Sequence, residues 1–325
     1  MITRQALDLD APAVVDGITE AIRVQTLGTL ARRGIVVGIS GGIDSSVVAA
    51  LSARALGPAR VFGLLMPERD SSDDSTRLGR LLADALGIVT LTENVTPLLE
   101  AAACYERQAQ AIRRVFPEYV AGQRFKVRLP SILASARLNV PFVVVDTGEG
   151  ICEFRLSAEA SRELVAATNF KQRIRAMLEY YHADRLHYAV AGTPNRLEYD
   201  QGFFVKQGDG AADLKPIAHL YKTQVYQLAE FLGVPEEIRR RHPTTDTYPL
   251  AQTQEEFYFS LPHSEMDLCL YARNHGIPSA DVAAALGLTA EQVERVFRDI
   301  DQKRRSTRYL HRQPLLVHPV REVAP

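Results

Sequence analysis

The sequence reads Ile35-Val36-Val37-Gly38-Ile39-Ser40-Gly41-Gly42-Ile43-Asp44-Ser45-Ser46 where an apolar run passes through two glycines into a helix. The apolar run is typical of a buried strand, and the first N–H groups of the following helix have no partner within it. Glycines let the backbone approach an anion, serine hydroxyls add donors, and the helix dipole favours negative charge. The pattern predicts a phosphate-binding loop; the alternative is a glycine turn with a helix-capping serine.

One acidic residue, Asp44, lies among these expected phosphate contacts. Its carboxylate is explained if it holds Mg2+, because proteins commonly bind this ion through one or two carboxylates and substrate phosphate oxygens. No Gly-Lys-Ser or Gly-Lys-Thr follows the glycines, so the lysine of a Walker loop is missing. We therefore do not expect transfer of the γ-phosphate as in a kinase.

The overall composition is that of a globular enzyme. The chain has 325 residues, of which 46% are hydrophobic and 24% are charged, and it can bury a sizeable core. Its 38 basic and 39 acidic residues argue against a dedicated nucleic-acid binder. No run approaches the ~18 to 20 apolar residues of a membrane span, so no membrane protein is expected. The three cysteines have no metal-type spacing and no secretory segment begins the chain, so we expect a cytoplasmic location.

Strand and helix patterns alternate along the chain. We expect helices at 11–33, 44–56, 75–86, 160–181 and 222–232, and strands at 35–39, 60–66, 88–92 and 187–191. This order predicts an α/β fold with a doubly wound parallel sheet and a nucleotide at the carboxyl ends of its strands. The C-terminal part is helical again. Its expected helices at 280–286 and 290–305 have Ser279 and Thr289 as N-terminal caps.

The loop at 40–46, Ser-Gly-Gly-Ile-Asp-Ser-Ser, resembles the pyrophosphate loop of the N-type ATP pyrophosphatases, which cleave ATP between its α- and β-phosphates. Several activities share this loop, so other stretches must select among them. These are Ala191-Gly192-Thr193-Pro194-Asn195-Arg196-Leu197-Glu198, Gly202-Phe203-Phe204-Val205-Lys206-Gln207-Gly208-Asp209-Gly210-Ala211-Ala212-Asp213-Leu214-Lys215-Pro216-Ile217 and Leu220-Tyr221-Lys222-Thr223-Gln224-Val225. In order and spacing they resemble the signature of ammonia-dependent NAD synthases, over about residues 11–100 and 160–300.

The resemblance implies an architecture for the whole chain. Residues 1–325 would form a single domain with an adenine nucleotide alpha hydrolase-like fold. An insertion is implied at about 100–158 and a helical C-terminal extension at about 235–325. Because that family is homodimeric, a homodimer with substrate sites at the subunit interface is implied as well.

The resemblance also implies roles for individual residues. ATP contacts are implied for Gly38, Ser40, Gly41, Gly42, Asp44, Ser45, Ser46, Met66, Thr193, Lys222 and Thr244. Contacts to the dinucleotide substrate are implied for Arg173, Lys206 and Asp213, and Mg2+ would be held by Asp44 and Glu198. Catalysis would depend on Asp44 and Lys222, because a lysine and a metal neutralise charge on a departing pyrophosphate. The alternatives for single residues are a solvated helix lysine at 222, a surface acid at 198 and a turn residue at 213.

The activity implied is a two-step amide synthesis. A carboxylate, by default that of deamido-NAD, attacks the α-phosphate of Mg-ATP with release of pyrophosphate, and ammonia then displaces AMP to give NAD. Ammonia would be free or supplied by a separate glutaminase, since the chain has no room for an amidotransferase domain ahead of the phosphate loop. Two alternatives stay open: a paralogue that amidates a sugar acid or natural-product precursor, and a non-catalytic adenine-nucleotide sensor.

Two segments depart from the family pattern. Residues 100–158 are longer than in the short NAD synthases and contain a β-type run at 140–150. They also carry basic residues with interleaved aromatic ones: Arg113, Arg114, Phe116, Tyr119, Arg124, Phe125, Lys126 and Arg128. We favour a solvated helix face with aromatic anchors over an insertion that covers the substrate or contacts a second subunit, and over a nucleic-acid surface. At the C-terminus, the family's His-Lys pair aligns with Tyr309-Leu310, and His311-Arg312 follows two places later.

Overall fold

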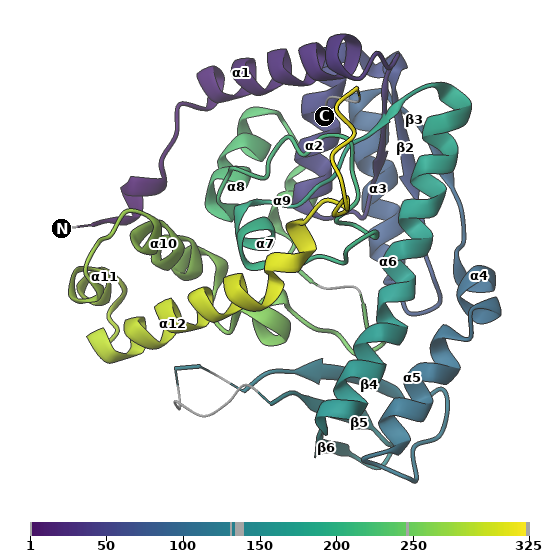
Figure 1. Ribbon diagram of the computed structural model, residues 1–325, viewed down its shortest axis with the longest axis vertical. Coiled ribbons are helices and arrows are strands. Elements are labelled where there is room, and N and C mark those ends of the chain that lie inside the picture. Colours follow the sequence, from purple (N-terminus) through teal and green to yellow (C-terminus); the bar gives the residue numbers. More distant parts are fainter. Residues whose placement is uncertain (1, 131, 134–139, 245–246, 323–325) are drawn as a thin grey trace.

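The computed structural model describes residues 2–130, 132–133, 140–244 and 247–322 (Figure 1). Its central element is a four-stranded parallel sheet in the order β3-β2-β1-β7. The strands are β1 (Ile35–Gly38), β2 (Val61–Leu65), β3 (Val89–Thr92) and β7 (Ala189–Val190). The order along the sheet changes direction at β1, and helices cover both faces, so the predicted doubly wound α/β fold is confirmed.

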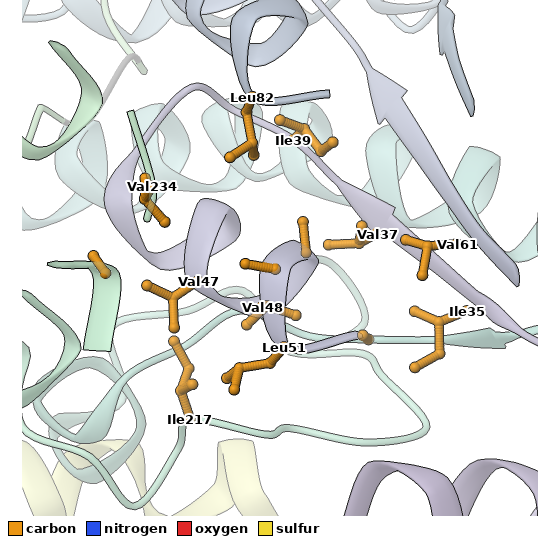
Figure 2. Packing of buried hydrophobic residues seen from close by; sticks show 14 of the residues in the cluster. Ile35, Val37, Ile39, Val47, Val48, Leu51, Val61, Leu82, Ile217 and Val234 are labelled. Carbon is orange, nitrogen blue, oxygen red and sulfur yellow. The ribbon is translucent and has the colours of Figure 1, made fainter. Parts of the chain in front are cut away.

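Side chains alternate between the two faces of the sheet along β1. Ile35 and Val37 pack in one cluster with α1 (Ala11–Arg23), α2 (Ile43–Leu56), α3 (Asp73–Leu86) and α8 (Lys222–Phe231) (Figure 2). Val36 belongs to the opposite face, where its cluster includes residues of α4 (Thr96–Ala101) and α6 (Ala158–Leu186). All three side chains are wholly buried, so β1 is fixed from both sides and its carboxyl end is a rigid platform for the loop that follows.

The segment between α4 and α6 forms a smaller unit beside the parallel sheet. It consists of α5 (Cys104–Arg113) and an antiparallel sheet of β4 (Arg124–Arg128), β5 (Phe142–Asp146) and β6 (Ile151–Arg155). Val127, Val143 and Leu164 share its apolar cluster, which packs against the start of α6. The predicted helix face is wrong for Arg124, Lys126 and Arg128, because charged and apolar residues alternate there with the period of a strand.

The C-terminal part is helical, as predicted, and packs around a further apolar cluster. Its elements are α9 (Glu236–Arg240), a π-helical turn (Glu255–Phe259), α10 (His263–Asn274), α11 (Ser279–Leu286) and α12 (Ala290–Thr307). Thr289 caps α12 as predicted, since its Oγ1 accepts the N–H of Gln292 over 3.2 Å. Ser279 is not a cap: α11 begins at this residue, and Pro278 before it offers no side-chain acceptor.

Some predicted elements have other lengths. The helix predicted at 11–33 stops at Arg23 and gives way to a π-helical turn. The strand predicted at 187–191 keeps only two residues, because His187 adopts a left-handed conformation that ends α6. Within the described part of the chain, no helix combines the length and the apolar character needed to cross a membrane. Short 3-10 turns lie at Arg4–Leu7, Pro58–Arg60 and Arg308–His311.

Candidate active site

The predicted phosphate loop lies between β1 and α2, where the strand order of the sheet reverses. Ligands of open parallel sheets bind at such positions. Gly41 has a φ of 73°, and a Cβ at this residue would lie 2.5 Å from the backbone oxygen of Ser75, so a side chain does not fit. The Ser40 N–H donates to Ser45 Oγ over 3.3 Å, and Ser45 Oγ donates to the Gly42 carbonyl over 3.1 Å. The loop is thus held in shape by its own hydroxyl groups.

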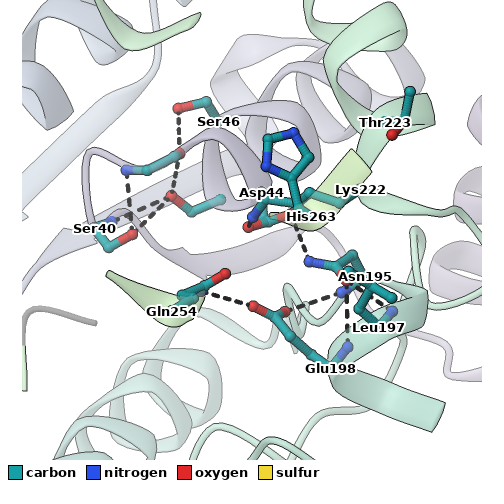
Figure 3. A network of polar contacts seen from close by, with 12 residues as sticks. Ser40, Asp44, Ser46, Asn195, Leu197, Glu198, Lys222, Thr223, Gln254 and His263 are labelled. Carbon is teal, nitrogen blue, oxygen red and sulfur yellow. Dashed lines mark hydrogen bonds and ion pairs between the residues drawn. The ribbon is translucent and has the colours of Figure 1, made fainter. Parts of the chain in front are cut away.

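An ion pair joins this loop to α8 (Figure 3). Lys222 is the first residue of α8, and its ammonium group pairs with Asp44 Oδ2. Asn195 Nδ2 donates to the other oxygen of the same carboxylate over 3.0 Å. Asp44 and Lys222, which were predicted to act together, are therefore in direct contact. Asn195 contacts the other oxygen of the Asp44 carboxylate and so fixes its orientation.

Glu198 is fixed beside this pair by the start of α7 (Arg196–Gln201). The Glu198 N–H donates to Asn195 Oδ1 over 3.3 Å, and the Asn195 N–H donates to Glu198 Oε2 over 3.1 Å. Gln254 Nε2 donates to the remaining Glu198 oxygen over 3.0 Å. No role was predicted for Asn195, although the sequence carries a signal for it. Asn followed three residues later by Glu at the start of a helix is a capping box.

Burial and like charge dominate the electrostatics of these groups. Burial and the nearby Asp44 carboxylate raise the pKa of Glu198 to about 8, against the opposing charge of Lys222. Burial acts to lower the pKa of Lys222, but Asp44 and Glu198 raise it above its ordinary value, so this lysine is charged at neutral pH. The Lys222 ammonium pairs with Asp44, and the Asp44 charge disfavours ionisation of Glu198, an arrangement that favours a further cation.

A cavity of about 900 Å³ contains most of the residues predicted to bind ligands. This volume is in the range of small-molecule and cofactor sites. Its lining includes Gly38, Ser40, Gly42, Asp44, Ser45, Met66, Arg173, Thr193, Glu198, Lys206, Lys222 and Thr244. The fold therefore brings the predicted ATP, metal and substrate residues to one cavity, from the ends of β1 and β2, from α6 and from the loops that follow.

Three predicted residues lie outside the described lining: Gly41, Ser46 and Asp213. Ser46 is wholly buried, and its hydroxyl donates to the Gly42 carbonyl over 2.8 Å. Asp213 Oδ2 accepts the Val190 N–H over 2.8 Å. The structure thus gives Ser46 and Asp213 contacts that stabilise the phosphate loop and the edge of the parallel sheet.

The C-terminal segment borders the cavity. Tyr309 and Leu310, which align with the His-Lys pair of the family, line it. Lys206 Nζ donates to the backbone oxygens of Tyr309 and Arg312, each over 2.9 Å. His311 instead packs edge-to-face against two aromatic rings. Lys206 therefore both lines the cavity and holds the C-terminal segment against it.

The small antiparallel sheet supplies a further wall of the cavity. Val127 of β4 and Leu129 directly after it are part of the lining, as is Pro141 just before β5. The neighbouring face of α6 contributes Val165, which is 45% exposed. This wall is apolar, whereas the phosphate loop is polar. The insertion thus contributes residues to the wall of the cavity.

A buried lysine without a signal in the sequence lies at the edge of the cavity. Lys171 is 1% exposed, and its Nζ donates to Glu68 Oε1 over 2.7 Å and to Asp70 Oδ2 over 2.8 Å. A third bond, of 2.8 Å, goes to the backbone oxygen of Thr247. Tyr105 of α5 donates to the second Glu68 oxygen over 2.7 Å. The Lys171 ammonium group thus connects α6 with the loop after β2 and the loop after α9. Glu68 extends this network to the insertion, because it also accepts the hydrogen bond from Tyr105.

The parallel sheet, the glycine loop without a Walker lysine and the facing carboxylates define a protein of the N-type ATP pyrophosphatase class. A family model described as NAD synthase matches residues 14–129 and 131–314. The chain therefore belongs to the NAD synthase family.

Two curated relatives match over nearly their full length. The chain is 61% identical over 311 residues to an NH(3)-dependent NAD(+) synthetase of Mesorhizobium japonicum, covering 95% of this chain and 98% of the relative. It is 30% identical over 301 residues to an NH(3)-dependent NAD(+) synthetase of Methanocaldococcus jannaschii, covering 93% and 96%.

Solved structures share the fold at lower identity. NMN synthetase from Francisella tularensis superimposes with a TM-score of 0.67 at 22% identity, covering 95% of this chain and 99% of that one. NH3-dependent NAD synthetase from Campylobacter jejuni gives 0.62 at 21% identity, covering 95% and 100%. These likenesses support the fold assignment.

Proposed function

We propose that this chain forms NAD by amidating deamido-NAD with ammonia, using ATP. It is a ligase that forms a C–N bond, like the family to which it belongs. In the first step a carboxylate oxygen of the substrate attacks the α-phosphorus of ATP. The bond from that phosphorus to the bridging oxygen breaks, and its electron pair leaves with pyrophosphate. In the second step ammonia attacks the activated carbonyl carbon, the bond to AMP breaks, and the nitrogen loses a proton.

The part of the protein in this reaction is positioning and charge stabilisation, because neither step needs a side-chain nucleophile. The N–H groups and hydroxyls of the phosphate loop would hold the phosphates. Lys222, fixed by Asp44, would oppose the negative charge that develops on the leaving pyrophosphate. The thiols of Cys104 and Cys269 are unsuited to nucleophilic catalysis, since burial raises their pKa to about 11 and about 12.

The residues present fit a magnesium ion held together with ATP. Asp44 and Glu198 line the same cavity, and burial together with the Asp44 charge raises the pKa of Glu198 to about 8. A cation would relieve this repulsion. No group of three or more His, Cys, Asp or Glu with metal-binding geometry occurs among the described residues, which suits an ion that takes its other ligands from phosphates and water. Bound there, Mg2+ would neutralise phosphate charge.

The remaining expectations concern the substrate and the surroundings. Arg173 and Lys206 would contact the anionic dinucleotide, Arg through a planar fork and Lys as a point charge.

The family resemblance favours a homodimer, and the position of Asp213 outside the cavity is compatible with a substrate contact made across a subunit interface. Free cysteines at 104, 152 and 269 suit the reducing cytoplasm. Ammonia would be free or supplied by a separate glutaminase.

The observation that carries this proposal is the contact of Asp44 with Lys222 in a cavity that also contains Glu198. NAD formed from ATP, Mg2+, ammonium and deamido-NAD should be followed by mass, together with AMP and pyrophosphate. Asp44→Ala and Glu198→Ala should each lower the rate at least about 100-fold. Asp301→Ala is the matched control, because this acid pairs at the surface of α12 with Arg273 over 2.8 Å. Its rate should be unchanged.

Two other results would reject the proposal. If deamido-NAD stimulates no AMP release whereas a sugar acid does, the chain amidates another carboxylate. If no carboxylate is turned over although ATP binds, the chain is an adenine-nucleotide sensor.

A further inference from the structure

The first turn of α8 is held by an acidic side chain from the C-terminal part. Asp267 lies on α10 and is wholly buried. Its Oδ1 accepts the N–H of Lys222 over 3.2 Å, and its Oδ2 accepts the N–H and the hydroxyl of Thr223, each over 2.6 Å. One carboxylate therefore accepts three hydrogen bonds from the two residues that begin the helix, and one of these residues is the lysine that pairs with Asp44.

This contact takes the place of an ordinary helix cap. The residue before α8 is Tyr221, and tyrosine is not among the side chains that usually cap helices. Its hydroxyl accepts a hydrogen bond from Asn274 Nδ2 over 3.3 Å. The first N–H groups of a helix have no partner within it, so a buried helix start needs acceptors from elsewhere. Asp267, 45 positions from Lys222 along the chain, supplies them.

The charge of Asp267 suits a helix that begins with a lysine. A helix dipole is positive at its N-terminus, so a lysine in the first turn is disfavoured and a nearby carboxylate is favoured. Burial raises the pKa of Asp267 to about 6, against the hydrogen bonds from Thr223 and Lys222, so the group is mainly ionised at neutral pH. Its negative charge therefore offsets the unfavourable interaction between the dipole and Lys222.

Asp267 is itself held in place by the packing of α10. The residues on both sides of it, at 266 and 268–270, are wholly buried in the apolar cluster of the C-terminal part. A close-packed core resists the displacement of its members. The backbone of Lys222 is thus fixed to this cluster, while its ammonium group reaches Asp44 of the phosphate loop (Figure 3).

We propose that Asp267 is a positioning residue for the reaction, which fixes the backbone of Lys222 and thereby the place of its ammonium group in the cavity. A lysine side chain is a point charge on a flexible stem, so the charge is placed accurately only if both ends of the residue are held. Asp44 holds the charged end and Asp267 holds the backbone. This inference rests on the proposed function, in which Lys222 opposes the charge on the departing pyrophosphate.

A double-mutant cycle with Lys222→Met tests this coupling through the rate of NAD formation. In Asp267→Asn the amide nitrogen cannot accept a hydrogen bond, so at least one of the three bonds is lost. This variant should lower kcat about 10- to 100-fold, as a small misplacement of a catalytic group does, and should change KM for ATP less. Lys222→Met should lower kcat at least about 100-fold. Because Asp267 acts through Lys222, the double variant should match Lys222→Met within about twofold.

Thr223 provides a milder pair of variants. Thr223→Val removes only the hydroxyl group that donates to Asp267, so kcat should fall, but less than in Asp267→Asn. Thr223→Ser keeps the hydroxyl group and should retain most of the wild-type kcat. If Asp267→Asn does not fold, the same cycle is measured with Thr223→Val.

The matched control is Thr289→Ala. It removes a helix cap at the start of α12, whereas the cavity is reached by Thr307 at the other end of that helix. Its kcat should be unchanged, which separates the loss of a cap as such from the loss of the cap that holds Lys222.

Two results would overturn the assignment. One is a double variant whose rate falls by the product of the two single losses, as expected if Asp267 only supports the fold. The other is a wild-type kcat in both Asp267→Asn and Thr223→Val. The proposed function fails separately, if the wild type forms no NAD. The same cycle is then measured on the affinity for ATP with Mg2+ by calorimetry, where losses that do not add keep the assignment and additive losses reject it.

Discussion

Replacing Lys171 with methionine should destabilise the protein by about 3 to 5 kcal/mol near neutral pH. The substitution keeps the apolar stem and removes the ammonium group from Glu68 and Asp70. The side chains of Lys171 and Glu68 are 1% and 0% exposed, so water cannot replace the lost hydrogen bonds. The magnitude is that of a buried ion pair that loses one partner and leaves the other charge uncompensated.

Urea unfolding followed by circular dichroism and tyrosine fluorescence measures this loss, since the chain has 12 tyrosines and no tryptophan. Lys126→Met provides the matched control. Lys126 pairs with Glu256 over 2.7 Å, but the two side chains are 21% and 31% exposed, and pairs near the surface contribute only about 0 to 1 kcal/mol. A loss in Lys171→Met no larger than that in Lys126→Met would refute the reasoning.

The pH dependence gives a second check. Burial acts to raise the pKa of Glu68, but the Lys171 charge and the hydrogen bonds hold it below its ordinary value of 4.5. A lowered folded-state pKa contributes stability that is present above the ordinary value and is lost as the pH falls through the folded value. In Lys171→Met the carboxyl group is buried without a cation, so protonation relieves its cost. The difference in unfolding free energy between wild type and variant should therefore shrink below about pH 5, and a constant difference would contradict the argument.

Three further perturbations follow from the geometry. Gly41→Ala should lower kcat/KM for ATP at least about tenfold, because an added methyl group is disfavoured at this positive φ and would collide with the Ser75 backbone oxygen, so that the loop has to distort. Unchanged kinetics would argue against a fixed turn. Thr289→Ala should reduce the unfolding free energy measured in urea by about 1 kcal/mol, and Thr289→Ser, which keeps the hydroxyl group, should retain most of the wild-type value. Equal unfolding free energies in Thr289→Ala and the wild type would show that the cap contributes no stability. Burial raises the pKa of Asp267 to about 6 from an ordinary 3.8, so its stability contribution is complete below pH 3.8 and is lost as the pH rises through about 6. In Asp267→Asn, the unfolding free energy should fall less steeply between pH 3.8 and about 6 than in the wild type. An equal fall in both proteins would show that other groups cause it.

The phosphate loop could be predicted from the sequence because its signal is local. The strand, the glycines and the first turn of the helix are all contained in 35–46, so neighbours in sequence are neighbours in space. The position of Lys171 could not be predicted in this way. Its three partners lie 103, 101 and 76 positions away, and a single lysine in a helical pattern is normally solvent-exposed.

The insertion was mispredicted for a different reason. In β4 the buried residues are Phe125 and Val127, which alternate with Arg124, Lys126 and Arg128. This period of two was visible in the sequence and is typical of a half-buried strand. The basic residues were instead interpreted as the solvated face of a helix. The packing of the sheet against α6, by which it reaches the cavity, depends on contacts that no local pattern encodes.

The long helix α6 has a consequence for substrate choice. Its 29 residues correspond to a length of about 43 Å. Figure 1 shows that the helix runs from the small sheet to the parallel sheet. Ser161 and Glu179, both in the lining of the cavity, are about 27 Å apart along this one rod. A straight helix does not stretch, so the spacing between the insertion and the phosphate loop is constant. An acceptor that contacts both ends of this wall would have to match that fixed length.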